Sequence, residues 1–489
     1  MIPLSVETKQ RLLLLSCRVL LLAVVLIIPA VALSANINVP QTGQSVVYGA
    51  GDDGDLQKGV GWPLPRFVIN TDGTVTDILT NLVWLENANC YGNMSWGTAL
   101  SNAAALKNGD CGLSDTSLAG DWRLPNVREL ESLLHLGENT PAVPNTAGTG
   151  SATNGNPFVS LQQNYYWSSS SNTSGPSQAF SVSLRYGHIV LREKSNSIST
   201  IFVRNNNGGT PLAHVYATGQ SRCYDSAGVE TSCIDTGQDA DEQAGLSWPV
   251  PRFTDNGDGT ISDNLSGLRW LKNANCLGIT NWNTALTWAN TLKNGSCGLT
   301  DGSEELDWRL PNRKELMSLA DYGNNSPALP NTNGDGRWTA NDPFVSVQSA
   351  SYFSSSTYDA FSGYAWNISF QAGTTGTIVK TALGYAWAVR DEVVSRNLTV
   401  TFGGVGSGTI TSTPAGISCP GVCSADFARN SMVTLSAKPV IGFRVGSWSI
   451  ASCGSNSSCN VNMSEDQAVT VSFVEASSTE PAWIILLMD

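Results

Sequence analysis

Apolar residues recur along this chain at a spacing typical of helices. The i, i+3, i+4, i+7 pattern predicts a helix over residues 96–106, and Asn108-Gly109 supplies its stop signal. A second helix is predicted after Trp122-Arg-Leu-Pro, with Asn126 as the cap and Glu129 as its capping-box partner. The apolar positions of the first helix are Trp96, Ala99, Leu100, Ala103 and Leu106.

Short alternating segments bounded by turn residues predict strands around these helices. Residues 253–262 show the pattern of two strands joined by a tight Asn-Gly-Asp-Gly turn. Residues 397–475 alternate without any helix signal, which predicts a small all-β domain.

An internal repeat organises the rest of the chain. Trp62-Pro-Leu-Pro-Arg66 recurs as Trp248-Pro-Val-Pro-Arg252, 186 residues later, and the same offset continues to Val203-Arg204 and Val389-Arg390. An offset that is unbroken over this length indicates a duplicated domain. We therefore predict two α+β modules, residues 36–205 and 206–391, each with two helices against antiparallel strands.

The register changes upstream of the first Trp-Pro motif. Thr42-Gly-Gln44 matches Thr218-Gly-Gln220 at an offset of 176, so module 2 has ten additional residues there. Cys223 and Cys233 lie in this segment and are both missing from module 1, which supports their pairing with each other. By the same reasoning we predict two further disulfides, Cys90–Cys111 and Cys276–Cys297.

Four cysteines fall in the predicted all-β domain. We expect two disulfides there, with a connectivity that the sequence leaves open. Zinc is the alternative for this spacing, but no histidine lies nearby and exported chains favour disulfides. These cysteines are Cys419, Cys423, Cys453 and Cys459.

The N-terminal segment of the chain predicts export. Residues 1–34 combine basic positions with an apolar run, as in a signal peptide; an uncleaved anchor is the alternative. Residues 476–489 form a tail whose apolar run is too short to span a bilayer.

The net charge of −13 disfavours nucleic acid and anionic membranes as partners, because their phosphates would be repelled.

No histidine is repeated between the modules. A hydrolase or transferase often needs a histidine base beside a nucleophile, so histidine-dependent catalysis shared by both modules is excluded. We expect the protein not to be an enzyme. The three histidines are His135, His188 and His214, and the residues at the same offset are Asp321, Thr374 and Val400.

Two repeated charged positions lie in the Trp-Arg-Leu-Pro motif. Glu129 is either a general base or a helix cap, and the capping-box spacing favours the cap. Arg123 and its repeat Arg309 are expected to satisfy buried carbonyls or to pair with a carboxylate such as Asp121 or Asp307.

Three carboxylates on the turn of module 2 form a candidate metal site. Asp255, Asp258 and Asp263 would offer oxygen ligands on a tight loop, as calcium needs. Calcium is thus the one possible cofactor. The alternative is a plain hairpin turn, which the Asn-Gly and Asp-Gly pairs favour.

Aromatic residues on one repeated strand form a candidate ligand site. Tyr166 and Trp167, with Tyr352 and Phe353 in module 2, could present rings to a sugar, although an alternating strand turns half of them to the core. Loops that differ between the modules are the other candidates, because specificity often resides in loops on a rigid scaffold. These loops are 140–156, 172–178, 326–341 and 357–363.

Several of these strings together resemble the Lcl C-terminal domain family. The carriers are residues 256–270, the Trp308-Arg-Leu-Pro-Asn-Arg-Lys-Glu-Leu316 string, a Ser-Ser-Ser strand and the closing Val-Arg. The resemblance implies a fold related to C-type lectin-like domains and to formylglycine-generating enzymes. It also implies glycosaminoglycan binding on a cell surface.

The region 398–474 resembles the bacterial repeat domain of the divergent internalin B-repeat type. The carriers are Gly406-Ser-Gly-Thr-Ile, the Cys419-x3-Cys423 pair and Trp448. This resemblance implies a β-grasp-like spacer or adhesive unit.

The sequence therefore predicts a secreted, periplasmic or cell-surface binding or adhesion protein without catalytic activity. Polysulfated chains prefer basic surfaces, so the acidic balance favours a neutral glycan or a protein as the extracellular ligand. A structural spacer of the cell envelope is one alternative. An enzyme distantly related to formylglycine-generating enzymes is the other. The oligomeric state stays open.

Overall fold

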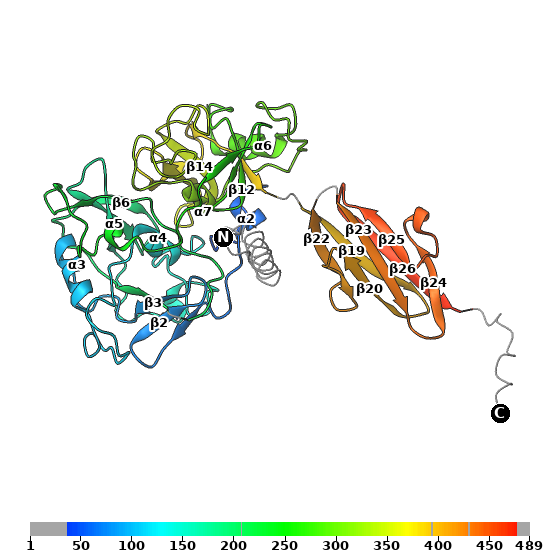
Figure 1. The fold of residues 1–489 in the computed structure, drawn as a ribbon, viewed down its shortest axis with the longest axis horizontal. Helices are drawn as coiled ribbons and strands as arrows, with labels where there is room; N and C mark the ends of the chain where they lie inside the picture. The colour runs from blue at the N-terminus through cyan, green and yellow to red at the C-terminus, as the bar shows by residue number, and fades with distance from the viewer. Residues whose placement is uncertain (1–36, 207, 393–394, 429–430, 477–489) are drawn as a thin grey trace, which may run out of the picture. The chain divides into compact units, whose positions relative to one another are not determined.

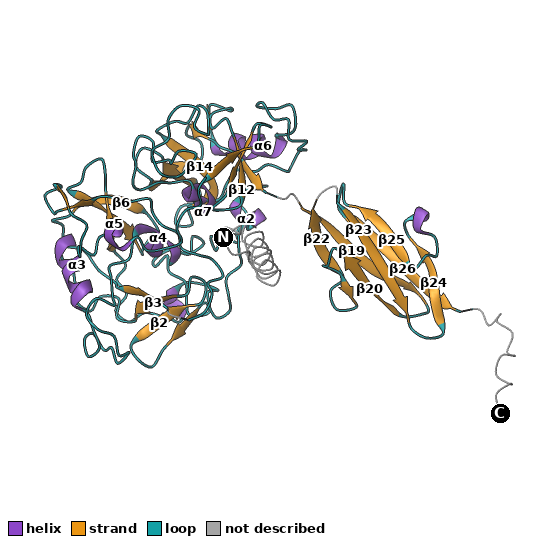
Figure 2. Cartoon of the chain, in the orientation of Figure 1, coloured by secondary structure: helices purple, strands orange, loops and turns teal. Residues whose placement is uncertain are grey.

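The computed structural model describes residues 37–206, 208–392, 395–428 and 431–476 (Figure 1). The predicted signal peptide and all but the first residue of the predicted tail lie outside these ranges. Within them, no helix is long and apolar enough to cross a membrane. Figure 2 shows short helices and strands joined by much loop in residues 37–392, and mostly strand in residues 395–476.

Module 1 is α+β, as the repeat pattern predicts. Its first sheet has the order β1-β2-β3-β7, so the last strand of the module returns to pair with β3, and Trp84 lies opposite Val203. The second sheet has the order β4-β5-β6. The elements are β1 (Phe67–Ile69), β2 (Thr74–Asp77), β3 (Leu82–Leu85), α3 (Trp96–Ala105), α4 (Val127–Ser132), β4 (Tyr165–Ser171), β5 (Gln178–Ser183), β6 (Ile189–Glu193) and β7 (Val203–Asn205).

Both predicted helices are confirmed. In α3, the predicted apolar positions are buried, since their spacing places them on one face of the helix. In α4, the side chain of Asn126 accepts hydrogen bonds from the first turn, and Glu129 closes the capping box.

Module 2 repeats these elements at the same offset. It adds a hairpin, β8 (Cys223–Tyr224) with β9 (Glu230–Thr231), and two short strands, β13 (Ile279–Thr280) and β17 (Gly384–Tyr385), that extend the second sheet to the order β13-β17-β14-β15-β16. The repeated elements are β10 (Phe253–Asp255), β11 (Thr260–Asp263), β12 (Leu268–Leu271), α6 (Trp282–Thr291), α7 (Arg313–Ser318), β14 (Ser351–Thr357), β15 (Tyr364–Ser369), β16 (Thr374–Val379) and β18 (Val389–Asp391).

Five disulfides are present, and the three predicted pairs are among them. Cys90–Cys111 and Cys276–Cys297 bracket α3 and α6 with Cα–Cα distances of 5.7 and 5.9 Å, and Cys223–Cys233 closes the added hairpin. The connectivity left open in the last domain is sequential. Its pairs are Cys419–Cys423 and Cys453–Cys459.

Residues 395–475 form an all-β domain, as predicted. Its two four-stranded sheets have the orders β22-β19-β26-β24 and β21-β20-β23-β25. A β-grasp would wrap one sheet around a helix, but the described residues here contain no α-helix, so that expectation is corrected. The alternating burial along β23 and β26 lets the two sheets bury each other's inner faces. The strands are β19 (Ser395–Gly404), β20 (Gly408–Thr413), β21 (Ser418–Cys419), β22 (Ser424–Ala428), β23 (Met432–Pro439), β24 (Phe443–Trp448), β25 (Ser458–Asn462) and β26 (Gln467–Glu475).

Near its start, each module has a loop that crosses to the other module. We call residues 41–59 arm 1 and residues 217–245 arm 2. A parallel bridge between Pro40 and Val60 closes the base of arm 1, and an equivalent bridge closes arm 2. Their short helices are α2 (Asp53–Leu56) and α5 (Asp239–Glu242).

Arm 1 binds module 2 through two polar side chains. The amide of Gln44 pairs with the backbone of Thr357: its Oε1 accepts from the amide N–H at 3.0 Å, and its Nε2 donates to the carbonyl. The buried carboxylate of Asp53 accepts from the hydroxyls of Ser356, at 2.5 Å, and of Thr42, at 2.7 Å.

Arm 2 makes the same contacts with module 1. Gln220 pairs with the backbone of Ser171, and Asp239 accepts from the hydroxyls of Ser170 and Thr218. The arms are thus exchanged: each module is completed by a segment near the start of the other one.

A lysine between two aromatic rings fixes the start of each arm. In module 2, Lys380 Nζ lies 3.9 Å from the ring centroid of Trp282 and 4.9 Å from that of Tyr48 in arm 1. In module 1, Lys194 Nζ lies 3.9 Å from the ring centroid of Trp96 and donates to the carbonyl of Tyr224 in arm 2. A cation over a ring gains more when it is desolvated, as both lysines are here.

The two modules also share one hydrophobic core. Leu133, which follows α4, and Leu319, which follows α7, belong to the same buried cluster. Arg128 of α4 donates to the hydroxyl of Tyr216 and to the carbonyls of Met317 and Ala320. The modules therefore form one packed unit.

The buried arm carboxylates predict a pH-dependent stability. Burial raises the pKa of Asp53 to about 7, although hydrogen bonds from Ser356 and Thr42 oppose the shift; burial raises that of Asp239 to about 6. The folded chain favours the protonated form of both carboxyls. Their contribution to the free energy of unfolding is therefore complete below the unfolded-state pKa of 3.8 and is lost as the pH rises through the folded-state pKa.

Asp53→Asn removes this titration. Its unfolding free energy should therefore rise relative to the unsubstituted protein by ~1.4 kcal/mol per pH unit between about pH 4 and pH 7. Denaturant unfolding across this range measures the difference, from which the histidine titrations cancel because both proteins contain them. Asp239→Asn should show the same trend, ending near pH 6. A difference that stays constant with pH for both variants would contradict the burial of these carboxyls in the contacts between arm and module.

Candidate functional site

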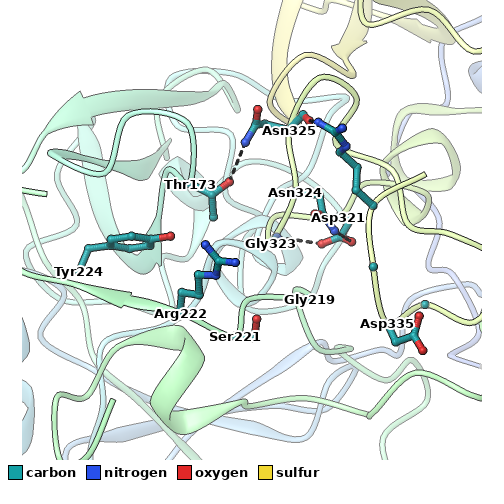
Figure 3. Close-up of a pocket in the computed structure, with 13 residues that line it drawn as sticks. Thr173, Gly219, Ser221, Arg222, Tyr224, Asp321, Gly323, Asn324, Asn325 and Asp335 are labelled. Atoms are coloured by element: carbon teal, nitrogen blue, oxygen red, sulfur yellow. Dashed lines mark hydrogen bonds between the residues drawn. The ribbon is translucent and has the colours of Figure 1, made fainter. Parts of the chain in front are cut away.

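A cavity of about 530 Å³ opens where arm 2 meets loops of both modules (Figure 3). Arm 2 lines it with residues from 219–224, module 2 with residues from 321–325 and 334–337, and module 1 with Thr173. Thr173 and residues 334–337 lie in two of the loops predicted to carry specificity. We call this the junction cavity.

Two glycines allow arm 2 and module 2 to approach closely at this cavity. A Cβ on Gly323 would lie 2.1 Å from the carbonyl oxygen of Gly219, and a Cβ on Gly219, whose φ is +90°, would lie 2.3 Å from Oδ1 of Asp321. Only glycine fits at either position.

Asp321 is a buried acceptor at one side of the cavity. Its Oδ1 accepts from the backbone N–H of Gly323 at 2.8 Å, and its Oδ2 from the side-chain amide of Asn324 at 2.6 Å. Burial raises its pKa to about 6, and these hydrogen bonds oppose the shift. The carboxyl is mostly ionised at neutral pH, which orients the Asn324 amide.

Exposed polar side chains form the rim. Arg222 has Glu230 at 3.8 Å as its ion-pair partner, and because their side chains are 65% and 59% exposed, this pair holds the guanidinium weakly. Asn325 donates to the hydroxyl of Thr173 at 3.3 Å and so links the two modules across the rim. In Figure 3 this link lies above both Arg222 and Asp321. The rim thus offers cationic donors and carbonyl or carboxylate acceptors to a ligand with several polar groups.

The equivalent place beside arm 1 carries different chemistry. Val46 stands where arm 2 has Arg222, and His135 stands where module 2 has Asp321. The His135 ring packs edge-on against Trp62 with centroids 4.9 Å apart, and burial lowers its pKa to about 4. The duplicated fold therefore has two equivalent junctions. The junction beside arm 2 has Arg222 and Asp321 where the junction beside arm 1 has Val46 and His135.

The four rings predicted to bind a ligand lie in the core. Tyr166, Trp167, Tyr352 and Phe353 are each 0% exposed. The strands β4 and β14 are covered on both faces, so the alternation that would expose half of the rings does not apply. None of these four ring faces is open to a sugar.

The structure does not bring the three candidate calcium ligands together. Asp255 forms an ion pair with Lys272 at 2.6 Å, Asp258 accepts from its own turn at Thr260, and Asp263 is buried against Arg252. In the described part of the chain, no group of three or more His, Cys, Asp or Glu residues is arranged to hold a metal ion. These carboxylates build the turn and its ion pairs.

The motif arginines pair with the capping glutamates. Arg123 donates two hydrogen bonds to the carboxylate of Glu129, at 2.5 and 2.6 Å, and Arg309 does the same with Glu315. The expected partner Asp121 instead accepts from a backbone N–H at Leu118. Glu129 and Glu315 lie nearer to these arginines because the first helical turn brings them back toward the Trp-Arg-Leu-Pro motif.

A family model matches both modules. The Lcl C-terminal domain model covers residues 73–204 and 259–390, which together make up more than half of the chain. The chain belongs to the Lcl C-terminal domain family. Both arms lie outside the two Lcl C-terminal domains, so the junction cavity combines residues inside and outside the family match. No curated protein and no solved structure matches the chain.

The sequence did not point to the arm residues of the cavity. Gly219, Arg222 and Tyr224 lie where the repeat register changes, beside the Cys223–Cys233 hairpin. That change was a usable signal, because a segment that differs between duplicates indicates a divergent function.

The close approach at Gly219 predicts a large effect of a single methyl group. Gly219→Ala should lower the unfolding free energy by roughly 2 kcal/mol or more, because the Cβ meets Asp321 and φ is positive. Gly363→Ala is the control: no atom lies within 4 Å of its Cβ position, so its effect should stay within about 0.5 kcal/mol. Equal stability of the two variants in denaturant unfolding would contradict the packing of arm 2.

Proposed function

We propose that this chain is an exported, non-catalytic binding or adhesion protein that holds an extracellular glycan or protein ligand in the junction cavity. The observation that carries the proposal is the cavity rim. It is formed by Arg222 of arm 2, Asn325 and Arg337 of module 2 and Thr173 of module 1. Arg222 and Arg337 are exposed, and Asn325 is half-buried.

The chemistry of the rim suits a ligand with many hydroxyl or carbonyl groups. Arginine and asparagine offer donors in fixed planar geometry, and Asp335, held by the amide of Asn331 at 2.9 Å, offers an acceptor. A preformed polar site binds without a large ordering cost. A cavity with little apolar surface gains specificity from such bonds.

The rest of the chain supports a surface role. Five disulfides are typical of oxidising compartments outside the cytoplasm. The resemblance of the modules to C-type lectin-like domains is consistent with a ligand site built from loops. The resemblance of residues 395–475 to the bacterial repeat type is consistent with a spacer that holds the modules away from the cell.

The histidines support a non-catalytic role. Burial lowers the pKa of both His135 and His188 to about 4, and neither lines the junction cavity. A general base works best with a pKa near the operating pH and close to the reacting group.

The residues of the other junction supply the test of the cavity. Arg222→Val with Arg337→Ser gives the cavity the side chains found at the equivalent positions Val46 and Ser151. If the full chain binds a member of a glycan or matrix-protein array, this variant should bind it at least ~10-fold more weakly, which corresponds to about 1.4 kcal/mol. Titration calorimetry measures the loss.

Lys293→Ala is the control for charge. This variant removes an exposed cation that pairs with Glu305 at 2.6 Å and should leave the affinity unchanged. Unchanged binding by the double variant would show that the ligand binds outside the junction cavity. An array without any bound member would favour the spacer function.

A further inference from the structure

Three aromatic residues found in module 2 only lie in the loop after β14 and at the start of β15. Tyr358, Phe361 and Tyr364 form what we call the aromatic ledge. Some core aromatic residues recur in both modules, as Trp96 and Trp282 do, and others do not, as Trp387 and Ile201 show, so the ledge is a feature of module 2. The module 1 residues at the ledge positions are Asn172, Gly175 and Gln178.

The rings of the ledge contact one another from the core to the surface. Tyr358 is buried, with its ring centroid 5.1 Å from that of Trp366. Phe361 follows at 6.0 Å from Tyr358, and Tyr364 at 6.3 Å from Phe361. Phe361 is 65% exposed and Tyr364 is 38% exposed. The ring of Phe361 is therefore open to solvent and available to a ligand.

The backbone of this loop is fixed by its own hydrogen bonds. The N–H of Tyr358 donates to the carbonyl of Tyr364 at 2.9 Å, and that of Tyr364 donates to the carbonyl of Phe361 at 2.9 Å. The rings are therefore presented on a closed loop, and a ligand would meet them without a large loss of loop entropy.

Carboxylates flank the ledge. Asp359 lies within the loop and accepts from the side-chain amide of Asn139. Glu138 directly precedes Asn139 in the chain, and burial together with the Asp359 charge raises the pKa of Glu138. Burial and the same Asp359 charge also raise the pKa of the Tyr48 hydroxyl in arm 1. The carboxylates of Asp359 and Glu138 thus supply hydrogen-bond acceptors beside the rings.

We propose that the aromatic ledge binds an uncharged pyranose of an extracellular glycan. The C–H face of the sugar packs on Phe361 and Tyr364, and sugar hydroxyls donate to Asp359 and Glu138. An anionic sugar is disfavoured by the two carboxylates. Two exposed rings cover far less than the ~800 Å² per partner of a stable protein interface, which favours a sugar over a protein ligand.

This site is separate from the junction cavity and does not depend on its function. Asp359 occupies the position equivalent to Thr173, which lines the junction cavity. The two equivalent junctions of the duplicated fold are thus specialised for different chemistry, one for many polar contacts and one for ring stacking.

Saturation-transfer NMR on the full chain tests the ledge. The probes are neutral tetrasaccharides of glucose, galactose and N-acetylglucosamine. We expect saturation of the ring C–H protons of at least one probe. Phe361→Gly and Tyr364→Gln, which introduce the residues of module 1, should each weaken binding at least ~10-fold, whereas Tyr364→Phe should retain it because the ring face persists.

Lys293→Ala is the control, because it removes an exposed cation outside both sites and should leave probe binding unchanged. The proposal is overturned if none of the three probes receives saturation, or if the Phe361 and Tyr364 variants bind as well as the unsubstituted protein. It is also overturned if Phe361→Gly abolishes binding of a matrix protein while neutral sugars show no transfer, since the ledge would then be a protein contact.

Discussion

Two buried carboxylates, Asp53 and Asp239, hold the paired modules in their arrangement. Each lies in an arm that leaves its own module and accepts a hydrogen bond from a serine hydroxyl of the other. A buried carboxyl costs several kcal/mol unless its lone pairs are satisfied, so the hydroxyls and the protonation state decide whether the arm stays bound. The shared core and the lysine–aromatic contacts then act on arms that are already in place.

The exchange of arms creates sites that simple duplication of a module would not provide. Two linked modules would offer two copies of one site, whereas crossing arms create two junctions to which both modules contribute. Because the arms lie outside the Lcl C-terminal domains, they can diverge while the modules keep their core. Arg222 in one arm and Val46 in the other show this divergence. The duplicated scaffold thus carries two binding chemistries on a single chain in the proposed function.

Much of the fold was predictable from the sequence, and the site was not. Helix spacing, the capping box at Asn126 and the paired loss of Cys223 and Cys233 all depend on local pattern, which a single chain displays. The burial of both Tyr166 and Trp167 could not be predicted from alternation, because that pattern assumes a sheet with one face exposed to solvent. The exchange of arms depends on contacts between residues about 300 positions apart, such as Gln44 and Thr357, which no local pattern encodes.

Cleavage between the modules tests the arm exchange most directly. A protease site placed at the exposed Gly208-Gly209 leaves each module with its own arm, and no disulfide crosses the cut. After cleavage, size-exclusion chromatography at pH 5 should give one complex of both fragments, because each arm still binds the other module. Gln44→Ala combined with Gln220→Ala should weaken that complex, because both amide–backbone pairs are lost. Separate elution of the two unsubstituted fragments would contradict the exchange of arms and the junction sites that depend on it.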